Sequence, residues 1–143
     1  MDNTVVFKTN RLVVRHFNSS DKPEFFGMMG NSNVMDPIPL KALSQIESNK
    51  KLKELIGLYN LKTNKQIWAV HLKNNTNLIG LCGLIINNEI ENEIAYRFRE
   101  DYWGFGYGSE IAKGLIDFGF KELGFELITA DVFIENKKSN KRY

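Results

Sequence analysis

Residues 78–86 form the longest apolar run of the chain, broken only by two glycines. A strand with one wet face alternates between polar and apolar residues, whereas a strand covered on both faces is apolar throughout. The run is also far shorter than the ~20 residues that a membrane-spanning helix needs. We therefore expect a central strand of a sheet that carries other layers on both faces. Cys82 in its middle is then a small buried apolar residue rather than a nucleophile.

The segments around this run predict a mixed sheet. Strand formers or alternating residues mark further strands at 11–15, 66–72, 89–98 and 127–134. Helices are predicted at 21–29, from Ser44, which has Glu47 at the capping-box spacing, and at 109–123. The last strand–helix–strand unit is expected to be parallel. The predicted fold class is α/β, with a mixed, mostly antiparallel central sheet flanked by helices.

Length and charge narrow the classes of function. With 143 residues, 43% of them hydrophobic, residues 1–143 are expected to form one domain whose core needs no disulfide. A net charge of +2 gives no reason to expect nucleic acid or a membrane as partner. His16 and His71 stand apart from other metal ligands, so no metal is expected. The first residues show no signal-peptide pattern, and we expect a cytoplasmic protein.

Three glycines alternate at Gly104, Gly106 and Gly108, directly before a predicted helix. Such a loop can adopt positive φ, and its N–H groups converge with those of the first helical turn on a phosphate. The alternative is a turn that only reverses the chain. A nucleotide-binding protein of unrelated fold is disfavoured, because the loop comes late in the chain and no Gly-Lys-Ser/Thr ends it.

The residues around the glycines carry a family resemblance. Residues 99–112 resemble the acetyl-CoA-binding motif of the GNAT superfamily, in particular the branch with the ribosomal-protein N-terminal acetyltransferases, which shows Tyr-Trp-Gly-x-Gly-Tyr-Ala/Gly-x-Glu-Ala. Trp103 stands where most GNAT proteins carry Gln or Arg, as is usual for this branch. Segments 9–15, 79–83, 92–96, 120–124 and 135–139 resemble other motifs of the branch, in order and over nearly the whole chain.

The resemblance implies a cofactor and a set of residues that hold it. Acetyl-CoA would be the co-substrate, and a protein N-terminal α-amine or a small-molecule amine the acceptor. The pyrophosphate would rest on the main-chain N–H groups of Gly104, Phe105, Gly106, Tyr107, Gly108 and Ser109, beside Trp103. The pantetheine arm would lie along Tyr96, Arg97 and Phe98, where the family's fourth and fifth strands splay apart, and Asn136 would contact the arm from the other side.

Acetyl transfer requires a neutral amine, so a proton acceptor is needed near neutral pH. Glu93 matches the acidic residue of the branch's fourth strand and is the candidate base. Alternatively, Glu89, Glu91 and Glu93 form only a solvated strand face. Tyr143 follows Asn136 at the spacing where some GNAT branches place the acid that protonates the thiolate, but chain ends also fray.

The C-terminal residues depart from the family pattern. Family members continue with an amphipathic helix and two more strands, whereas residues 140–143 are polar. We therefore expect a domain that is incomplete at its C-terminus, with an unpaired apolar edge at 127–134 through which copies self-associate. The alternative to an active enzyme is a catalytically impaired CoA-binding or protein-interaction module derived from this fold.

Overall fold

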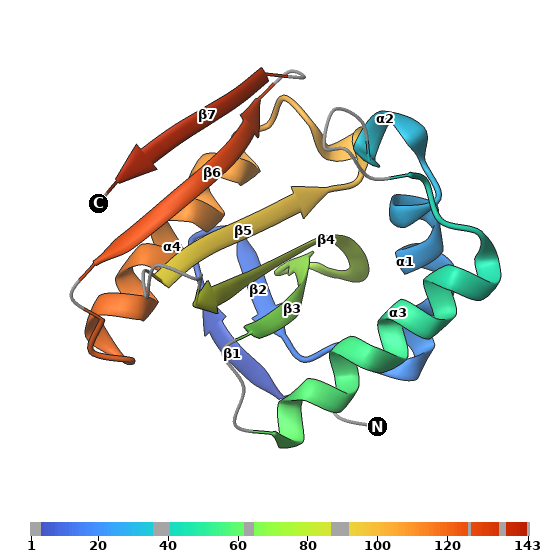
Figure 1. Ribbon diagram of the computed structural model, residues 1–143, viewed down its shortest axis with the longest axis horizontal. Helices are drawn as coiled ribbons and strands as arrows, with labels where there is room; N and C mark the ends of the chain where they lie inside the picture. The colour runs from blue at the N-terminus through green and yellow to red at the C-terminus, as the bar shows by residue number, and fades with distance from the viewer. Residues whose placement is uncertain are drawn as a thin grey trace.

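The fold is built on a single twisted sheet (Figure 1). The computed structural model describes residues 4–35, 41–61, 65–86, 92–125, 127–134 and 137–142. Its strands are hydrogen-bonded in chain order: β1 (Val5–Lys8), β2 (Leu12–Arg15), β3 (Lys65–Leu72), β4 (Asn75–Ile86), β5 (Asn92–Phe98), β6 (Ile128–Ile134) and β7 (Lys137–Arg142). All neighbours are antiparallel except β5 and β6, which are parallel, as predicted from the strand–helix–strand unit.

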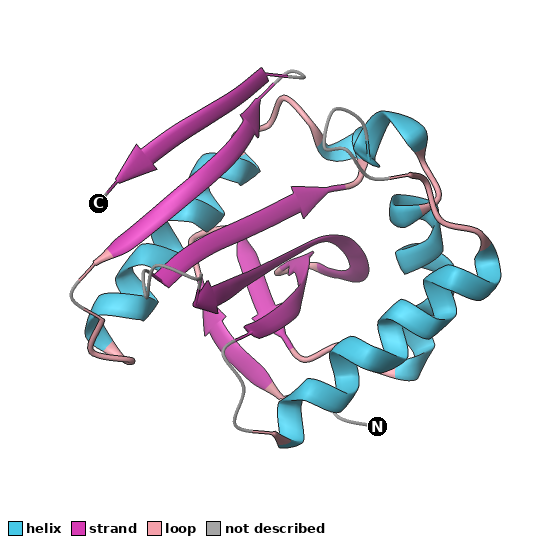
Figure 2. Ribbon diagram, viewed as in Figure 1, coloured by secondary structure: helices cyan, strands magenta, loops and turns pink. Residues whose placement is uncertain are grey.

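Helices cover both faces of the sheet (Figure 2). They are α1 (Lys22–Met29), α2 (Ser32–Met35), α3 (Gln45–Gly57) and α4 (Tyr107–Lys121), with 3₁₀ turns η1 (Ser19–Asp21), η2 (Leu58–Asn60) and η3 (Glu100–Tyr102). In the described part of the chain, none of them is long and apolar enough to cross a membrane. The first three helices pack on one face and α4 packs on the other, because each shares a separate apolar cluster with the strands.

The central strand is β4, as its apolar sequence predicts. It pairs with β3 on one side and with β5 on the other. Leu81 packs into the cluster under α1 and α3, whereas Cys82 packs into the cluster under α4. Cys82 is fully buried, and this burial raises the pKa of its thiol far above the ordinary range. The prediction that Cys82 is a buried apolar residue is therefore confirmed.

The local capping signal at Ser44 correctly identifies the start of α3. The Ser44 hydroxyl accepts a hydrogen bond from the Glu47 N–H, and the Glu47 carboxylate accepts one from the Ser44 N–H, so the predicted capping box is present at α3. Helix α4 begins at Tyr107, two residues before the predicted start. The reason is that Gly106 itself caps the helix in the left-handed conformation.

Three short elements escaped sequence prediction. Strand β1 and helix α2 have only four residues each, too few for a periodic signal. The third element, strand β7, corrects a prediction. Residues 137–142 run antiparallel along β6, so the prediction of an unpaired edge at 127–134 is wrong. The argument for self-association through that edge falls with it. Instead, the outer strand is polar and rich in lysine, a composition that disfavours pairing between copies.

Candidate active site

The parallel strands β5 and β6 separate soon after they meet (Figure 1). Their register comprises Asn92 with Ile128, Glu93 with Thr129, and Ile94 with Ala130, and it ends there. Both strands nevertheless continue for four more residues, to Phe98 and Ile134. In the described structure, residues 95–98 therefore pair with β4 but not with β6. The two strands thus part after Ile94 and Ala130, and we call the region between their diverging edges, from Ile94 toward Phe98, the slot.

The glycine loop stands at the Phe98 end of this slot. It follows η3 and enters α4, with φ of 85° at Gly104 and 81° at Gly106. These angles favour glycine, because a Cβ is strained in the left-handed region. The main-chain N–H groups of residues 104–109 donate to no acceptor in the described part of the chain. They lie at a helix N-terminus, where the helix dipole favours an anion.

Close packing sets the position of this loop against β5. A Cβ on Gly108 would lie 3.2 Å from Cε2 of Tyr96, so only glycine lets the start of α4 approach the ring without displacing it. The Trp103 indole Nε1 donates to the Phe98 carbonyl at 3.0 Å. Trp103 therefore supports the loop through the end of β5, while 46% of the residue remains exposed.

Arg11 is a residue of the site that sequence reasoning missed. Its Nη1 donates to the Phe105 carbonyl at 2.9 Å, and its Nε donates to the Glu110 carboxylate at 2.6 Å. The guanidinium also lies over the Tyr107 ring, 4.6 Å from the centroid. One side chain thus holds the loop, the first turn of α4 and an aromatic ring. No sequence signal joins residues so far apart in the chain.

Glu110 binds the turn between β1 and β2. Besides the Arg11 side chain, it accepts hydrogen bonds from the Arg11 N–H at 2.8 Å and from the Thr9 hydroxyl. Burial alone would raise the pKa of Glu110, but the hydrogen bonds from Thr9 and Arg11 outweigh it and lower the pKa below its ordinary value. An ionised Glu110 in the first turn of α4 stabilises the helix N-terminus through its negative charge.

The structure brings most of the predicted cofactor residues together. Tyr96, Phe98, Trp103 and residues 104–109 meet at the Phe98 end of the slot, and the rings of Phe98 and Tyr107 lie 6.1 Å apart. Arg97 does not join them, because alternation along β5 turns its side chain to the other face, toward α1 and α2. Asn136 and Tyr143 lie outside the described residues, as do Glu89 and Glu91.

Glu93 lies at the Ile94 end of the slot. It pairs with Thr129 one position before the last β5–β6 pair, and its residue is half-buried. Because Ile94 packs into the cluster under α4, the Glu93 side chain faces the side of α1 and α3. The candidate base therefore stands where the two strands part.

The remaining titratable candidates have structural contacts. The His16 ring stacks on Tyr59 with centroids 3.9 Å apart, and His71 Nδ1 lies 2.7 Å from the Leu72 carbonyl oxygen. Among the residues described, no three His, Cys, Asp or Glu side chains gather as metal ligands.

Comparison with known proteins identifies the class of enzyme. The family model of the Acetyltransferase (GNAT) domain matches residues 11–142. YoaA of Bacillus subtilis, described as an uncharacterized N-acetyltransferase, is 27% identical over 139 residues, covering 95% of this chain and 78% of its own. These matches show that the chain is an acetyl-transfer enzyme. The chain belongs to the GNAT acetyltransferase family, which uses acetyl-CoA.

Solved structures share the fold. A GNAT-family acetyltransferase from Bacillus anthracis matches with a TM-score of 0.76 and 26% identity, over 95% of this chain and 76% of that one. RimL, a ribosomal-protein alpha-N acetyltransferase solved with coenzyme A, matches with a TM-score of 0.72 and 17% identity, over 92% and 76% of the two chains.

Proposed function

We propose that this enzyme grips the diphosphate of acetyl-CoA on residues 104–109 and transfers the acetyl group to the α-amine of a peptide. The observation that carries the proposal is the row of main-chain N–H groups at the start of α4, which have no acceptor in the described structure. Converging amides at a helix N-terminus bind phosphate oxygens without any need for a lysine. Gly104 and Gly106 give the loop the backbone conformation that this binding requires.

The slot between β5 and β6 suits the rest of the cofactor. The pantetheine arm is extended and carries two amide groups, so it can lie along residues 95–98, beyond the last β5–β6 pair, as an added strand would. With the diphosphate at the Phe98 end, the arm points its thioester toward Ile94. This places the reacting carbonyl at the Ile94 end of the slot, close to Glu93.

Glu93 would then take the proton that the amine loses, directly or through a water. The amine nitrogen attacks the thioester carbon, a tetrahedral oxyanion forms, and the C–S bond breaks to release CoA as a thiolate. Main-chain N–H groups of β5 would stabilise the oxyanion. The thiolate needs a proton, and Tyr143 remains the proposed donor.

An α-amine suits a site with one carboxylate base. Its pKa of about 7.7–8.0 leaves a useful neutral fraction at pH 7, whereas a lysine amine near 10.4 is almost wholly protonated. The likeness to RimL supports the same choice of acceptor, since that enzyme is described as an alpha-N-protein acetyltransferase. Small-molecule amines are the alternative acceptors.

The proposal is tested by measuring cofactor binding and turnover separately. Calorimetry with acetyl-CoA should give binding that Gly106→Val weakens at least tenfold, because a branched side chain is strained at positive φ and crowds the amides. Gly57→Ala is the matched control, since a Cβ there meets nothing within 4 Å. Thiol release with a peptide panel then reports transfer. Normal binding by Gly106→Val would refute the cofactor site, and binding without thiol release would indicate a CoA-binding module.

A further inference from the structure

We infer that Arg97 selects the acceptor: its guanidinium receives a carboxylate of the peptide whose α-amine is acetylated. The inference rests on the proposed function and adds to it the chemistry of the substrate. It assigns the Arg97 side chain to the acceptor rather than to the cofactor.

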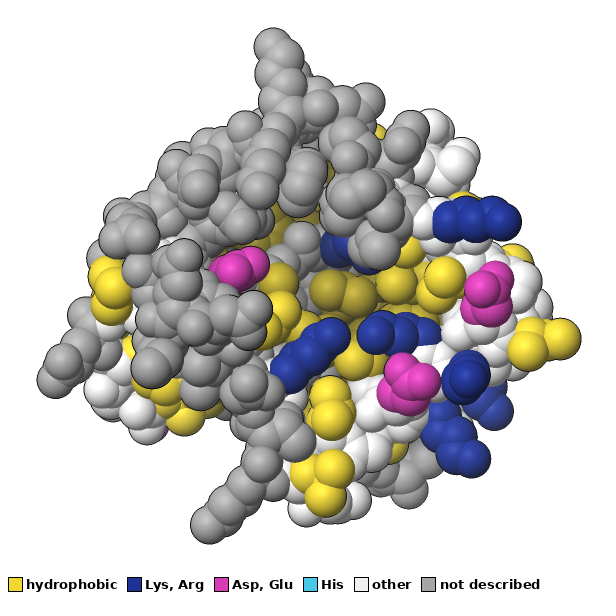
Figure 3. Space-filling view, viewed as in Figure 1, with side chains coloured by type: hydrophobic (Ala, Val, Ile, Leu, Met, Phe, Trp, Pro, Cys, Tyr) yellow, Lys and Arg dark blue, Asp and Glu magenta, His cyan; other side chains and the backbone are white. Residues whose placement is uncertain are grey.

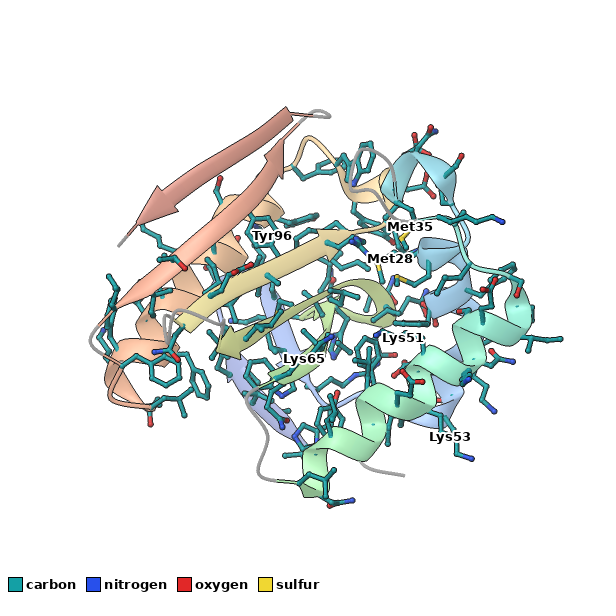
Figure 4. All side chains as sticks on the ribbon, in the orientation of Figure 1. Met28, Met35, Lys51, Lys53, Lys65 and Tyr96 are labelled. Atoms are coloured by element: carbon teal, nitrogen blue, oxygen red, sulfur yellow. The ribbon has the colours of Figure 1, made fainter. Side chains whose placement is uncertain are left out.

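The first step concerns the direction of the side chain. Ile94 and Phe98 on β5 belong to the apolar cluster under α4. Arg97 pairs across the sheet with Leu81, which belongs to the opposite cluster, under α1 and α3. Its Nη1 reaches Met35 at the end of α2, and Figure 4 labels this methionine where α2 meets the sheet. The guanidinium therefore lies on the same face as Glu93, away from the aromatic side of the slot.

The second step concerns the missing counter-charge. Nη1 of Arg97 lies 3.3 Å from Met35 Sδ and 3.6 Å from Met29 Sδ, and the described residues offer it no carboxylate. Thioether sulfur is a weak acceptor, whereas a guanidinium has five donors that match a carboxylate. The other arginines with described side chains each pair with an acid: Arg11 with Glu110, Arg15 with Asp21, and Arg99 with Glu24.

Burial makes this unpaired charge a strong attractor. Loss of solvent lowers the pKa of Arg97 from its ordinary value, although an arginine stays charged at any physiological pH. A desolvated cation is costly unless an anion accompanies it. A carboxylate that docks on the guanidinium supplies this anion, so binding of an acidic acceptor relieves a cost that a neutral acceptor leaves in place.

Lysine and arginine side chains also lie on this face (Figure 3), with acidic ones such as Glu54 among them. Figure 3 shows a hollow with a hydrophobic floor and with lysine or arginine side chains beside it. Figure 4 labels Lys51 of α3 and Lys65 of β3 on the same side of the sheet. Burial, together with the charge of Lys51, lowers the pKa of Lys65, while Glu54 opposes the shift. An acidic peptide would be attracted to such a face and a basic one repelled.

Register gives the distance between amine and carboxylate. Glu93 and Arg97 are four residues apart on one strand, which separates their Cα atoms by about 13 Å. An extended peptide advances about 3.3–3.6 Å per residue. With its α-amine near Glu93, a peptide can therefore present the side chain of its second to fourth residue to Arg97.

The test compares two peptides that differ only in charge, Ala-Ala-Asp-Ala amide and Ala-Ala-Asn-Ala amide. The enzyme should acetylate the Asp peptide with a kcat/KM at least tenfold higher, through KM rather than kcat. Arg97→Met should reduce the preference to twofold or less, and Arg97→Lys should keep part of it. Lys121→Met is the charge-matched control, because Lys121 ends α4, which packs on the face of the sheet opposite the Arg97 side chain. Equal use of both peptides by the unmodified enzyme would overturn the inference.

A second measurement does not depend on turnover. The N-acetylated forms of both peptides are titrated into the CoA-loaded protein, and the Asp form should bind more tightly, with the difference lost in Arg97→Met. Affinity for CoA alone should not change in that variant. If Arg97→Met instead weakens CoA binding, or if neither acetylated peptide binds better than the other, Arg97 does not recognise the acceptor. If the unmodified protein does not bind CoA, the proposed function itself is refuted.

Discussion

Nε of Arg11 and Oε1 of Glu110 lie 2.6 Å apart, although 99 residues separate them in the chain. This contact joins the turn between β1 and β2 to the first turn of α4. The glycine loop before α4 is therefore held by a segment near the opposite end of the sequence. Its geometry depends on this ion pair as well as on its own glycines.

Arg11→Met should weaken acetyl-CoA binding about three- to tenfold, because the Phe105 carbonyl and the Tyr107 ring lose their common contact. Global stability should change little, since an ion pair with an exposed member contributes only about 0–1 kcal/mol. Calorimetry and thermal unfolding separate the two effects. Arg11→Lys is the control, because it keeps the charge but cannot bind both groups. Unaltered affinity in both variants would contradict the role given to Arg11.

Glu110 should make stability depend on pH. Its pKa is lower in the folded protein than in the unfolded chain, so ionised Glu110 stabilises the fold above its unfolded pKa of about 4.3. This contribution disappears as the pH falls through the lower, folded value. Urea unfolding between pH 7 and pH 3 should therefore show a smaller acid-side loss in Glu110→Gln than in the unmodified protein. If the free energy of unfolding falls equally with pH in Glu110→Gln and in the unmodified protein, the prediction is contradicted.

Gly108→Ala should disturb the slot through Tyr96. The added Cβ would lie 3.2 Å from the ring, so the ring or the start of α4 must shift by a few tenths of an ångström. We expect about five- to tenfold weaker acetyl-CoA binding. We also expect the free energy of unfolding to fall by about 1 kcal/mol, within the usual range for overpacking. Gly57→Ala, with open space around its Cβ, should leave the affinity unchanged. Equal acetyl-CoA affinity in the two variants would show that the Gly108–Tyr96 contact does not affect cofactor binding.

Glu93→Gln separates the base from the solvated strand face. As a base, Glu93 contributes about 10²–10⁴-fold to the rate, and its loss should lower kcat without changing the affinity for CoA. The deficit should shrink above pH 8, where the acceptor α-amine loses its proton without help. Single-turnover rates between pH 6 and pH 9.5 measure this. A variant with normal kcat at pH 7 would assign Glu93 to the strand surface.

Sequence reasoning found the elements with strong local signals. The apolar run identified β4, the Ser44–Glu47 spacing identified the start of α3, and the alternating glycines identified the loop before α4. These signals are local, because burial on both faces, capping and positive φ each act on neighbouring residues. The expectation that the family's fourth and fifth strands splay apart came from the family resemblance rather than from any residue pattern.

What escaped prediction depends on contacts between distant residues. β7 has no apolar alternation and forms by pairing with β6. The bond between Arg11 and Glu110 needs the assembled sheet to bring its partners together. Only the fold shows that the Arg97 side chain lies beside two methionine sulfurs and no described acid.

The short seam between β5 and β6 also bears on the motion of the molecule. In the described structure, three residue pairs between β5 and β6 join the outer hairpin of β6 and β7 to the rest of the sheet, and Ile128 packs into the apolar cluster under α4. In the binding mode proposed above, acetyl-CoA between the strands would add contacts to both sides and would stabilise the paired hairpin in proportion to the logarithm of its concentration. The supply of acetyl-CoA in the cell would then govern how often that hairpin opens, and amide hydrogen exchange along β6 would report the metabolic state.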